Sequence, residues 1–176
     1  MSAGTRFGAA CFVRRAMQFT QSISYPGAVD EVVAMYLTPA YLERRFGQFV
    51  VEGSQVVSVE GERVSFAGTV RPELIPAAAA RFVKSDLRIT FTEEWTMNEA
   101  GATSRTSVTV DGAPVSVEAT STLAPVEAGC TRDVTGNVSV RVPLLGGRIE
   151  KEAVAHLGRV VEREQALATQ WLDEHR

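Results

Sequence analysis

The amino-acid sequence predicts an α+β fold in which a curved antiparallel sheet of about seven strands wraps one long C-terminal helix. Three observations carry this prediction. Segments with the two-residue period of half-buried strands recur through most of residues 17–142. Short turns separate them, which is typical of antiparallel neighbours rather than of βαβ crossovers. The stretch 148–174 instead has apolar residues at helical spacing and contains no proline.

One strand and two short helices are expected at the start of the patterned region. Residues 17–25 alternate between apolar and polar, and a Pro-Gly pair ends the strand. A short helix is expected over 29–37, because acidic residues occupy its first turn, where the helix dipole favours them. Thr38 before Pro39 predicts the N-cap and first position of a second helix, which ends at Gly47.

The middle of the chain is predicted to be rich in strands. Residues 51–59 and 62–70 are expected to pair as a hairpin, with the turn at Glu60-Gly61. The apolar segment 76–84 is predicted to form a short helix, and two interpretations of it stay open. It covers the open mouth of the sheet, or it is a plain connector over a sheet edge. The further strands are expected at 87–95, 103–110, 115–123 and 130–142.

The last element is a long amphipathic helix over 148–174. At 1.5 Å per residue it is roughly 40 Å long, enough to cross a whole sheet. Gly146 and Gly147 are expected to let the chain turn tightly from strand into helix, and Glu150 suits the positive end of the helix dipole. The apolar stripe consists of Ile149, Ala153, Leu157, Val160, Val161, Leu167, Ala168 and Trp171.

The composition narrows the classes of protein. Hydrophobic residues make up 45% and charged residues 22%, the balance of an ordinary globular domain. A formal net charge of -3 with interspersed signs argues against a nucleic-acid partner, and no apolar run reaches the ~20 residues that span a bilayer. Cys11 and Cys130 are expected to be reduced thiols of a cytoplasmic protein, with a disulfide between them as the alternative. Residues 1–16 are expected to be a disordered extension of a single domain, 17–176.

No arrangement of residues typical of a catalytic or metal site is present in the sequence. It contains no H-E-x-x-H pair, no G-x-S-x-G elbow and no phosphate-binding loop. His156 lies off the apolar stripe and is expected at the surface, and His175 belongs to the C-terminal tail. We therefore predict no catalytic residue, no metal and no cofactor.

The order of elements resembles the START/Bet v-type (SRPBCC) superfamily, which has the helix-grip fold, and the resemblance covers residues 17–171. Three stretches resemble, more narrowly, an uncharacterised bacterial branch of it, a domain of unknown function. They are Phe19-Thr20…Ile23…Tyr25-Pro26, Glu93-Glu94-Trp95, and residues 140–151 (VRVPLLGGRIEK). The resemblance implies a cavity between the sheet and the long helix that holds lipids, sterols, polyketides or other apolar molecules. It carries over no catalytic residues.

Several residues are expected to line such a cavity. Glu93 shares a strand face with Phe91 and Trp95, and Glu164 lies within the stripe of the long helix. If buried, either carboxyl could act as an acid or anchor a ligand, but the simpler expectation is that both reach solvent. Gln21 could bind a ligand or be satisfied by the backbone. The full set of cavity candidates is Phe19, Gln21, Phe82, Phe91, Glu93, Trp95, Leu157, Val161 and Glu164.

Three functions remain open at this point. The leading hypothesis is a binding or carrier protein for an apolar small molecule, lipid or polyketide-like, without enzymatic activity. The alternative is a cyclase/aromatase-like enzyme that positions its substrate with one or two buried polar residues. Convergence of Glu93, Glu164 or Gln21 in one pocket would favour the enzyme. The third is a protein-interaction module that uses residues 72–86 or the long helix, which a large exposed apolar patch would support.

Overall fold

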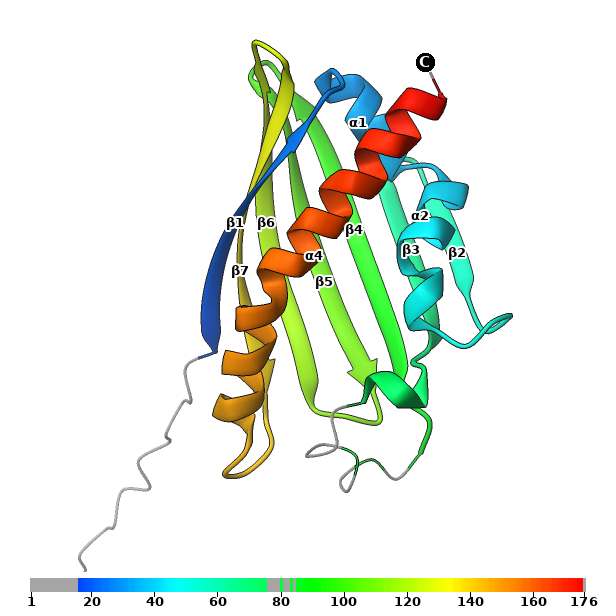
Figure 1. Cartoon of the computed structure of the whole chain (residues 1–176), viewed down its shortest axis with the longest axis vertical. Helices are drawn as coiled ribbons and strands as arrows, with labels where there is room; N and C mark the ends of the chain where they lie inside the picture. The colour runs from blue at the N-terminus through cyan, green and yellow to red at the C-terminus, as the bar shows by residue number, and fades with distance from the viewer. Residues whose placement is uncertain (1–15, 76–79, 81–82, 84, 176) are drawn as a thin grey trace, which may run out of the picture.

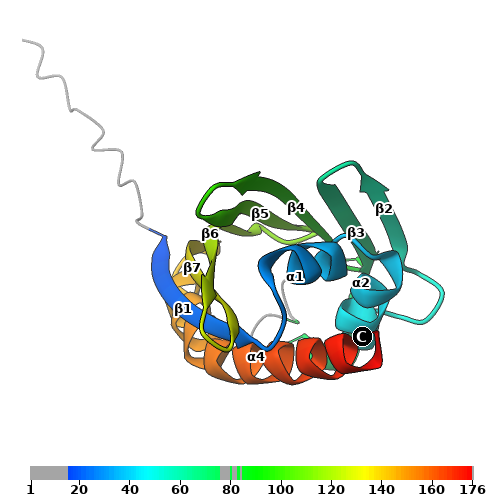
Figure 2. The ribbon, with the colours of Figure 1, turned by 90° about the horizontal axis from the view of Figure 1, so that it is seen from above.

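The computed structural model describes residues 16–75, 80, 83 and 85–175. Its strands form one seven-stranded sheet in the order β1-β7-β6-β5-β4-β3-β2, with every neighbouring pair antiparallel. The sheet curves around the long C-terminal helix (Figures 1 and 2), so the predicted α+β helix-grip architecture is confirmed. The strands are β1 (Met17–Tyr25), β2 (Val56–Glu60), β3 (Arg63–Thr69), β4 (Arg88–Asn98), β5 (Gly101–Asp111), β6 (Val115–Val126) and β7 (Gly129–Val140).

Two short helices, α1 (Val29–Tyr36) and α2 (Pro39–Phe46), carry the chain from β1 at one edge of the sheet to β2 at the other. Single 3-10 turns follow at Gly47–Phe49 and Pro72–Leu74. The predicted strand at 51–59 begins only at Val56, because Ser54 N–H donates to the carbonyl of Val51 and closes a turn first. The predicted extension 1–16, apart from Ala16, and most of the predicted helix 76–84 lie outside the described residues.

Thr38 is the N-cap of α2 and Pro39 is its first residue, as predicted. The Thr38 hydroxyl donates to the carbonyl of Ala34 at 2.8 Å, within the helix that it follows, and makes no side-chain cap on α2. The acidic first turn of α1 is as expected, and Glu31 accepts a hydrogen bond from the backbone N–H of Ala28 at 2.8 Å.

The turn from β7 into the long helix α4 (Gly146–Glu174) is made differently from the prediction. Gly146 and Gly147 already belong to the helix, and neither has a positive φ. The reversal falls on Leu144, whose φ is 65°, and Gly146 N–H donates to the carbonyl of Val142 at 2.9 Å to close the turn. A leucine therefore holds the left-handed conformation that glycine adopts at no steric cost.

The long helix is packed tightly along only part of its length. Near its C-terminus Ala168, Trp171 and Leu172 are buried in a core that includes β1 and α1. Toward its N-terminus Leu157 is only half-buried and Val160 is exposed, although both belong to the predicted stripe. The short helices lie beside the C-terminal half of α4, which explains the difference (Figures 1 and 2).

Candidate functional site

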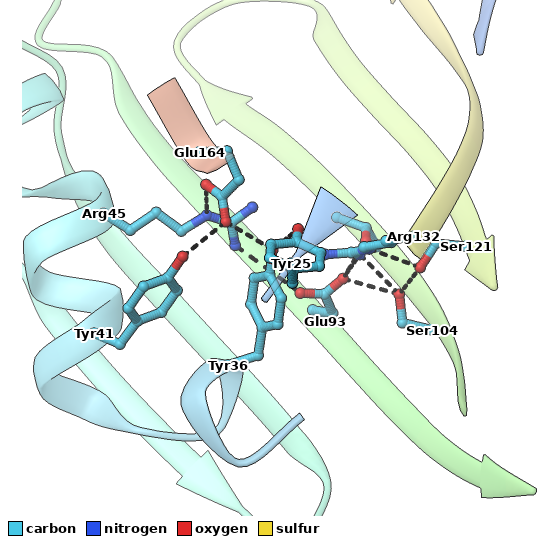
Figure 3. Close-up of polar contacts among 10 residues, drawn as sticks. Tyr25, Tyr36, Tyr41, Arg45, Glu93, Ser104, Ser121, Arg132 and Glu164 are labelled. Atoms are coloured by element: carbon cyan, nitrogen blue, oxygen red, sulfur yellow. Dashed lines mark hydrogen bonds and ion pairs between the residues drawn. The ribbon is translucent and has the colours of Figure 1, made fainter. Parts of the chain in front are cut away.

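The concave face of the sheet divides into a polar end and an apolar end. At the polar end, beneath α1, α2 and the C-terminal half of α4, two arginines and two glutamates form a group in which Arg45 is partly buried and the other three are buried (Figure 3). We call this group, Arg45, Glu93, Arg132 and Glu164, the ionic cluster. At the opposite end, beside the start of α4, the sheet borders a pocket that contains no charged side chain among its described lining residues.

One half of the ionic cluster is built by the sheet. Arg132 on β7 and Glu93 on β4 point inward, and Arg132 Nη2 donates to Glu93 Oε1. Ser104 and Thr106 on β5, the neighbour of β4, each donate to the same carboxylate oxygen at 2.9 Å. Arg132 Nε donates to the hydroxyl of Ser121 at 2.9 Å. Strand alternation explains the arrangement, because residues two apart share one face of a sheet.

The other half is built by helices. Arg45 on α2 donates through Nε to Glu164 Oε2 at 2.8 Å, and this ion pair ties α2 to α4. The second oxygen of Glu164 accepts hydrogen bonds from the hydroxyls of Tyr36 at 2.7 Å and Tyr41 at 3.0 Å. The hydroxyls of Tyr25 and Tyr36 also lie 2.7 Å apart. The chain has three tyrosines, and all of them belong to this network.

Tyr36 joins the two halves through its ring. The guanidinium of Arg45 lies 5.0 Å from the ring centroid, and that of Arg132 lies 4.9 Å from it. Arg132 also lies 4.7 Å from the centroid of the Trp95 ring. Cation–π contacts of this kind gain strength when they are removed from water. They lower the cost of removing the two guanidinium groups from water.

The charges in the cluster alternate and sum to zero. Arg45 Nη1 and Glu93 Oε2 face each other at 4.0 Å, which completes the row Arg132–Glu93–Arg45–Glu164. These two atoms are buried and find no hydrogen-bond partner among the described residues, and the same holds for Trp95 Nε1. Opposite charges at this distance attract strongly where water is scarce, so the row acts as one electrostatic unit.

The pKa values of the cluster follow from this arrangement. Burial alone would raise the pKa of Glu93, but Arg132 and Arg45, helped by the serine and threonine donors, hold that pKa below its usual value. Burial works against the charged form of Arg132, but the carboxylate of Glu93 together with Tyr36 and Tyr25 outweighs it, so the pKa of Arg132 is raised. Burial, reinforced by the nearby carboxylate of Glu164, raises the pKa of Tyr36 well above the usual value. At neutral pH the cluster therefore holds charged arginines, a charged Glu93 and a neutral Tyr36.

The apolar pocket has a volume of about 290 Å³. The inner faces of the central strands line it with Ile89, Val110, Val115 and Val140, and the first turns of α4 contribute Ile149. Between the pocket and the ionic cluster, the inward-facing residues of β5 and β6 are only partly buried. Val108 and Thr106 are the two such residues of β5, and they lie between the pocket and the carboxylate of Glu93. The interior is therefore less densely filled toward the pocket than around the cluster.

The structure brings some of the predicted cavity residues together and separates others. Glu93 and Glu164 are both buried, so the expectation that they reach solvent is wrong, and Arg45 lies between them. Phe91 and Trp95 are buried on the same face of β4. The reason is that α1 and α2 cover this end of the sheet, which the sequence pattern of β4 does not reveal.

The remaining candidates lie elsewhere on the concave side. Gln21 is half-buried on β1, on the strand register of Val134, and makes no contact with the ionic cluster that the structure describes. Phe19 packs over Gly136, where an added Cβ would lie 2.6 Å from the phenyl ring. Leu157 and Val161 are half-buried on α4. Phe82 lies outside the described residues.

Sequence reasoning missed both arginines and two of the tyrosines. The alternation of β7 was a signal for Arg132, because Cys130 and Val134, two residues before and after it, lie on the inward face of the strand. The signal for Arg45 was its place one helical turn after Tyr41, which is fully buried. Another surprise is Glu150, which is buried and accepts the backbone N–H of Val140 at 2.8 Å.

Within the described part of the chain, histidine, cysteine and acidic side chains form no group suited to a metal ion. Cys130 is a buried thiol on β7, and burial raises its pKa to about 11. His156 is exposed, as predicted, and its Nδ1 lies 2.7 Å from the carbonyl of Glu152. None of the described helices combines the length and the apolar character needed to cross a bilayer.

The fold belongs to a class with many solved structures. Norcoclaurine synthase from Thalictrum flavum superposes with a TM-score of 0.60 at 12% identity, covering 99% of this chain and 97% of that one. A conserved protein from Geobacillus kaustophilus gives a TM-score of 0.57 at 15% identity, covering 90% and 96%. The di-domain ARO/CYC StfQ from the steffimycin biosynthetic pathway gives 0.58 at 12% identity, covering 92% of this chain and 52% of StfQ. Identities this low establish a shared fold and nothing about chemistry.

The chain itself belongs to the family described as "Protein of unknown function (DUF2505)", whose model matches residues 20–172. This confirms the resemblance to an uncharacterised branch of the superfamily. The uncharacterized protein Rv0481c of Mycobacterium tuberculosis is 27% identical over 166 residues, covering 88% of this chain and 95% of that protein. The uncharacterized protein Mb0491c of Mycobacterium bovis matches with the same identity and coverage.

Proposed function

We propose that this protein binds an apolar small molecule, lipid or polyketide-like, between the sheet and the N-terminal half of α4. The observation that carries the proposal is the pocket of about 290 Å³, whose described lining residues include no charged side chain. Sites for small molecules are usually concave and mostly apolar, with volumes from about 300 Å³ upward. The partly buried residues Thr106 and Val108 extend the accessible interior toward the ionic cluster.

In this proposal the ionic cluster closes the inner end of the site and fixes its shape. Three donors already occupy Glu93 Oε1, and Glu164 engages Arg45 and two tyrosine hydroxyls. Such a network holds α1, α2, α4 and the sheet in one arrangement. The network forms the polar inner end of an otherwise apolar site.

The same bonding argues against the enzymatic alternative. Glu93 and Glu164 lie on either side of Arg45, whereas Gln21 makes no described contact with this group. A general acid or base at neutral pH needs a pKa near 7, whereas the arginines hold the pKa of Glu93 below its usual value. A carboxylate stabilised in this way is a weak base, and at neutral pH it holds no proton to donate. We therefore favour a carrier over a cyclase/aromatase-like enzyme.

The test compares two adjacent residues of β5. Val110 lines the pocket and Thr109 points to the opposite, outer face. Val110→Phe should fill the pocket, whereas Thr109→Phe adds the same ring on the outside. With Nile red as the probe, we expect Val110→Phe to weaken binding by about tenfold or more, because roughly 1.5–3 kcal/mol of apolar burial is lost. Thr109→Phe should bind like the wild type.

Native mass spectrometry of the purified protein supplies the second readout. A co-purifying hydrophobic molecule at one-to-one ratio, absent from Val110→Phe and present in Thr109→Phe, would support the carrier. Circular dichroism of both variants checks that they fold, since overpacking costs about 1–3 kcal/mol. Equal Nile red binding by two folded variants would refute this location for the site.

A further inference from the structure

The loop between β7 and α4 presents an apolar tip with basic side chains before and after it in the chain. Leu144 is fully exposed. Within residues 141–151 the exposed charged side chains are Arg141, Arg148 and Lys151, all basic, and the one acid, Glu150, is buried. The chain as a whole carries a net charge of -3, so the exposed charge of this segment is opposite in sign to that of the whole chain.

The tip is held outward by a backbone conformation that leucine rarely adopts. Leu144 has a φ of 65°, and a non-glycine residue in the left-handed region costs roughly 1–2 kcal/mol. The surrounding bonds fix it there: Gly146 N–H donates to Val142, and the buried Glu150 accepts from Val140 at 2.8 Å. The strained backbone of Leu144 therefore lowers the stability of the loop while it exposes an apolar side chain. Backbone strain of this kind clusters at functional sites.

The loop also stands beside the apolar pocket. Val142 and Ile149, which flank the tip, line that pocket. On the outer side Arg141, Leu144 and Arg148 border an open hollow of about 500 Å³. A surface that met this loop would therefore touch the rim of the pocket as well.

We infer that residues 141–151 dock the protein on an anionic phospholipid membrane. Leu144 enters the acyl region, and Arg141, Arg148 and Lys151 contact lipid phosphates. Each basic side chain near an anionic surface adds a few-fold to binding, and one leucine adds about tenfold or more. The sum corresponds to weak, reversible binding, comparable with the about 10⁴ M⁻¹ of a single myristoyl chain. An anionic lipid surface complements the basic loop, whereas two copies meeting loop to loop would bring like charges together.

The experiment is co-sedimentation of the full chain with vesicles of phosphatidylcholine alone, or of phosphatidylcholine with phosphatidylglycerol. We expect binding to the anionic vesicles that weakens with added salt, and little binding to the neutral ones. Leu144→Ser should reduce binding about tenfold, and Arg141→Gln with Arg148→Gln by about as much. The matched control is Val126→Ser, which removes an exposed apolar side chain from the opposite end of the sheet.

Several outcomes would overturn the inference. They are no binding to either vesicle, equal binding to both, or full binding by Leu144→Ser. A concentration-dependent dimer in light scattering that Leu144→Ser abolishes would instead make this face a contact between two copies. The proposal stands apart from ligand binding, because Val110→Phe should still sediment with anionic vesicles. Loss of Nile red binding and loss of vesicle binding are therefore distinguishable.

Discussion

Replacing Arg132 by methionine removes the charge at one end of the ionic cluster. Arg132 is buried on β7, and methionine has a similar length without the charge. The substitution deletes the ion pair with Glu93 and the hydrogen bond to Ser121. It leaves a buried carboxylate whose nearest remaining cation is Arg45, at 4.0 Å and without a hydrogen bond.

The expected cost at neutral pH is about 3–5 kcal/mol, the usual result of stranding one partner of a buried pair. A domain of this size melts roughly 2–4 °C lower per kcal/mol, so the melting temperature should fall by roughly 6–20 °C. Arg105→Met is the control, because Arg105 is exposed on the outer face of β5. It should change the free energy of unfolding by less than about 0.5 kcal/mol.

The pH dependence gives the sharper test. In the wild type the pKa of Glu93 is lowered from 4.5, so its stabilisation is present above that pH and is lost as the pH falls below it. Without Arg132, burial dominates and the pKa of Glu93 moves upward, so the variant gains relative stability in acid. Urea unfolding followed by tryptophan fluorescence should show the two proteins converging from neutral toward acidic pH. A cost below about 1 kcal/mol at neutral pH, or a gap that stays constant with pH, would refute the reasoning.

Two further predictions concern the tyrosines and the long helix. Burial raises the pKa of Tyr25 to about 12, and the pKa values of Tyr36 and Tyr41 are raised as well. The neutral forms of these tyrosines stabilise the fold below the unfolded-state pKa of about 10, and this stabilisation is lost as the pH rises above that value. Tyrosinate absorbance should therefore appear together with unfolding in an alkaline titration, and three independent transitions near pH 10 would contradict the buried network. On α4, Ala168→Arg places a charge in the core and should unfold the protein, whereas Leu157→Arg at a half-buried position should cost clearly less. Equal losses in urea unfolding would mean that the helix is packed evenly along its length.

Local pattern determined most of the architecture. Period-two alternation placed the strands within a few residues, since burial of one sheet face repeats every second side chain. The helical stripe of 148–174 predicted the long helix for the same kind of reason. Where boundaries moved, as at Val56 and Leu144, a backbone hydrogen bond or a single dihedral decided the turn. Such choices depend on one residue and leave little periodic signal.

The candidate site divides along the same line. The sequence could place Glu93 on the inward face of a strand, because that is a local property. Only the tertiary structure decided that Glu93 is buried and paired, since Arg132 lies 39 residues away in the chain and Glu164 meets Arg45 across 119. Pairing over such distances depends on which strands and helices come together. Alternation fixed the direction of each side chain, and the partners were fixed by the curvature of the sheet, which brings Arg132 to Glu93, and by the packing of α2 and α4 against it, which brings Arg45 and Glu164.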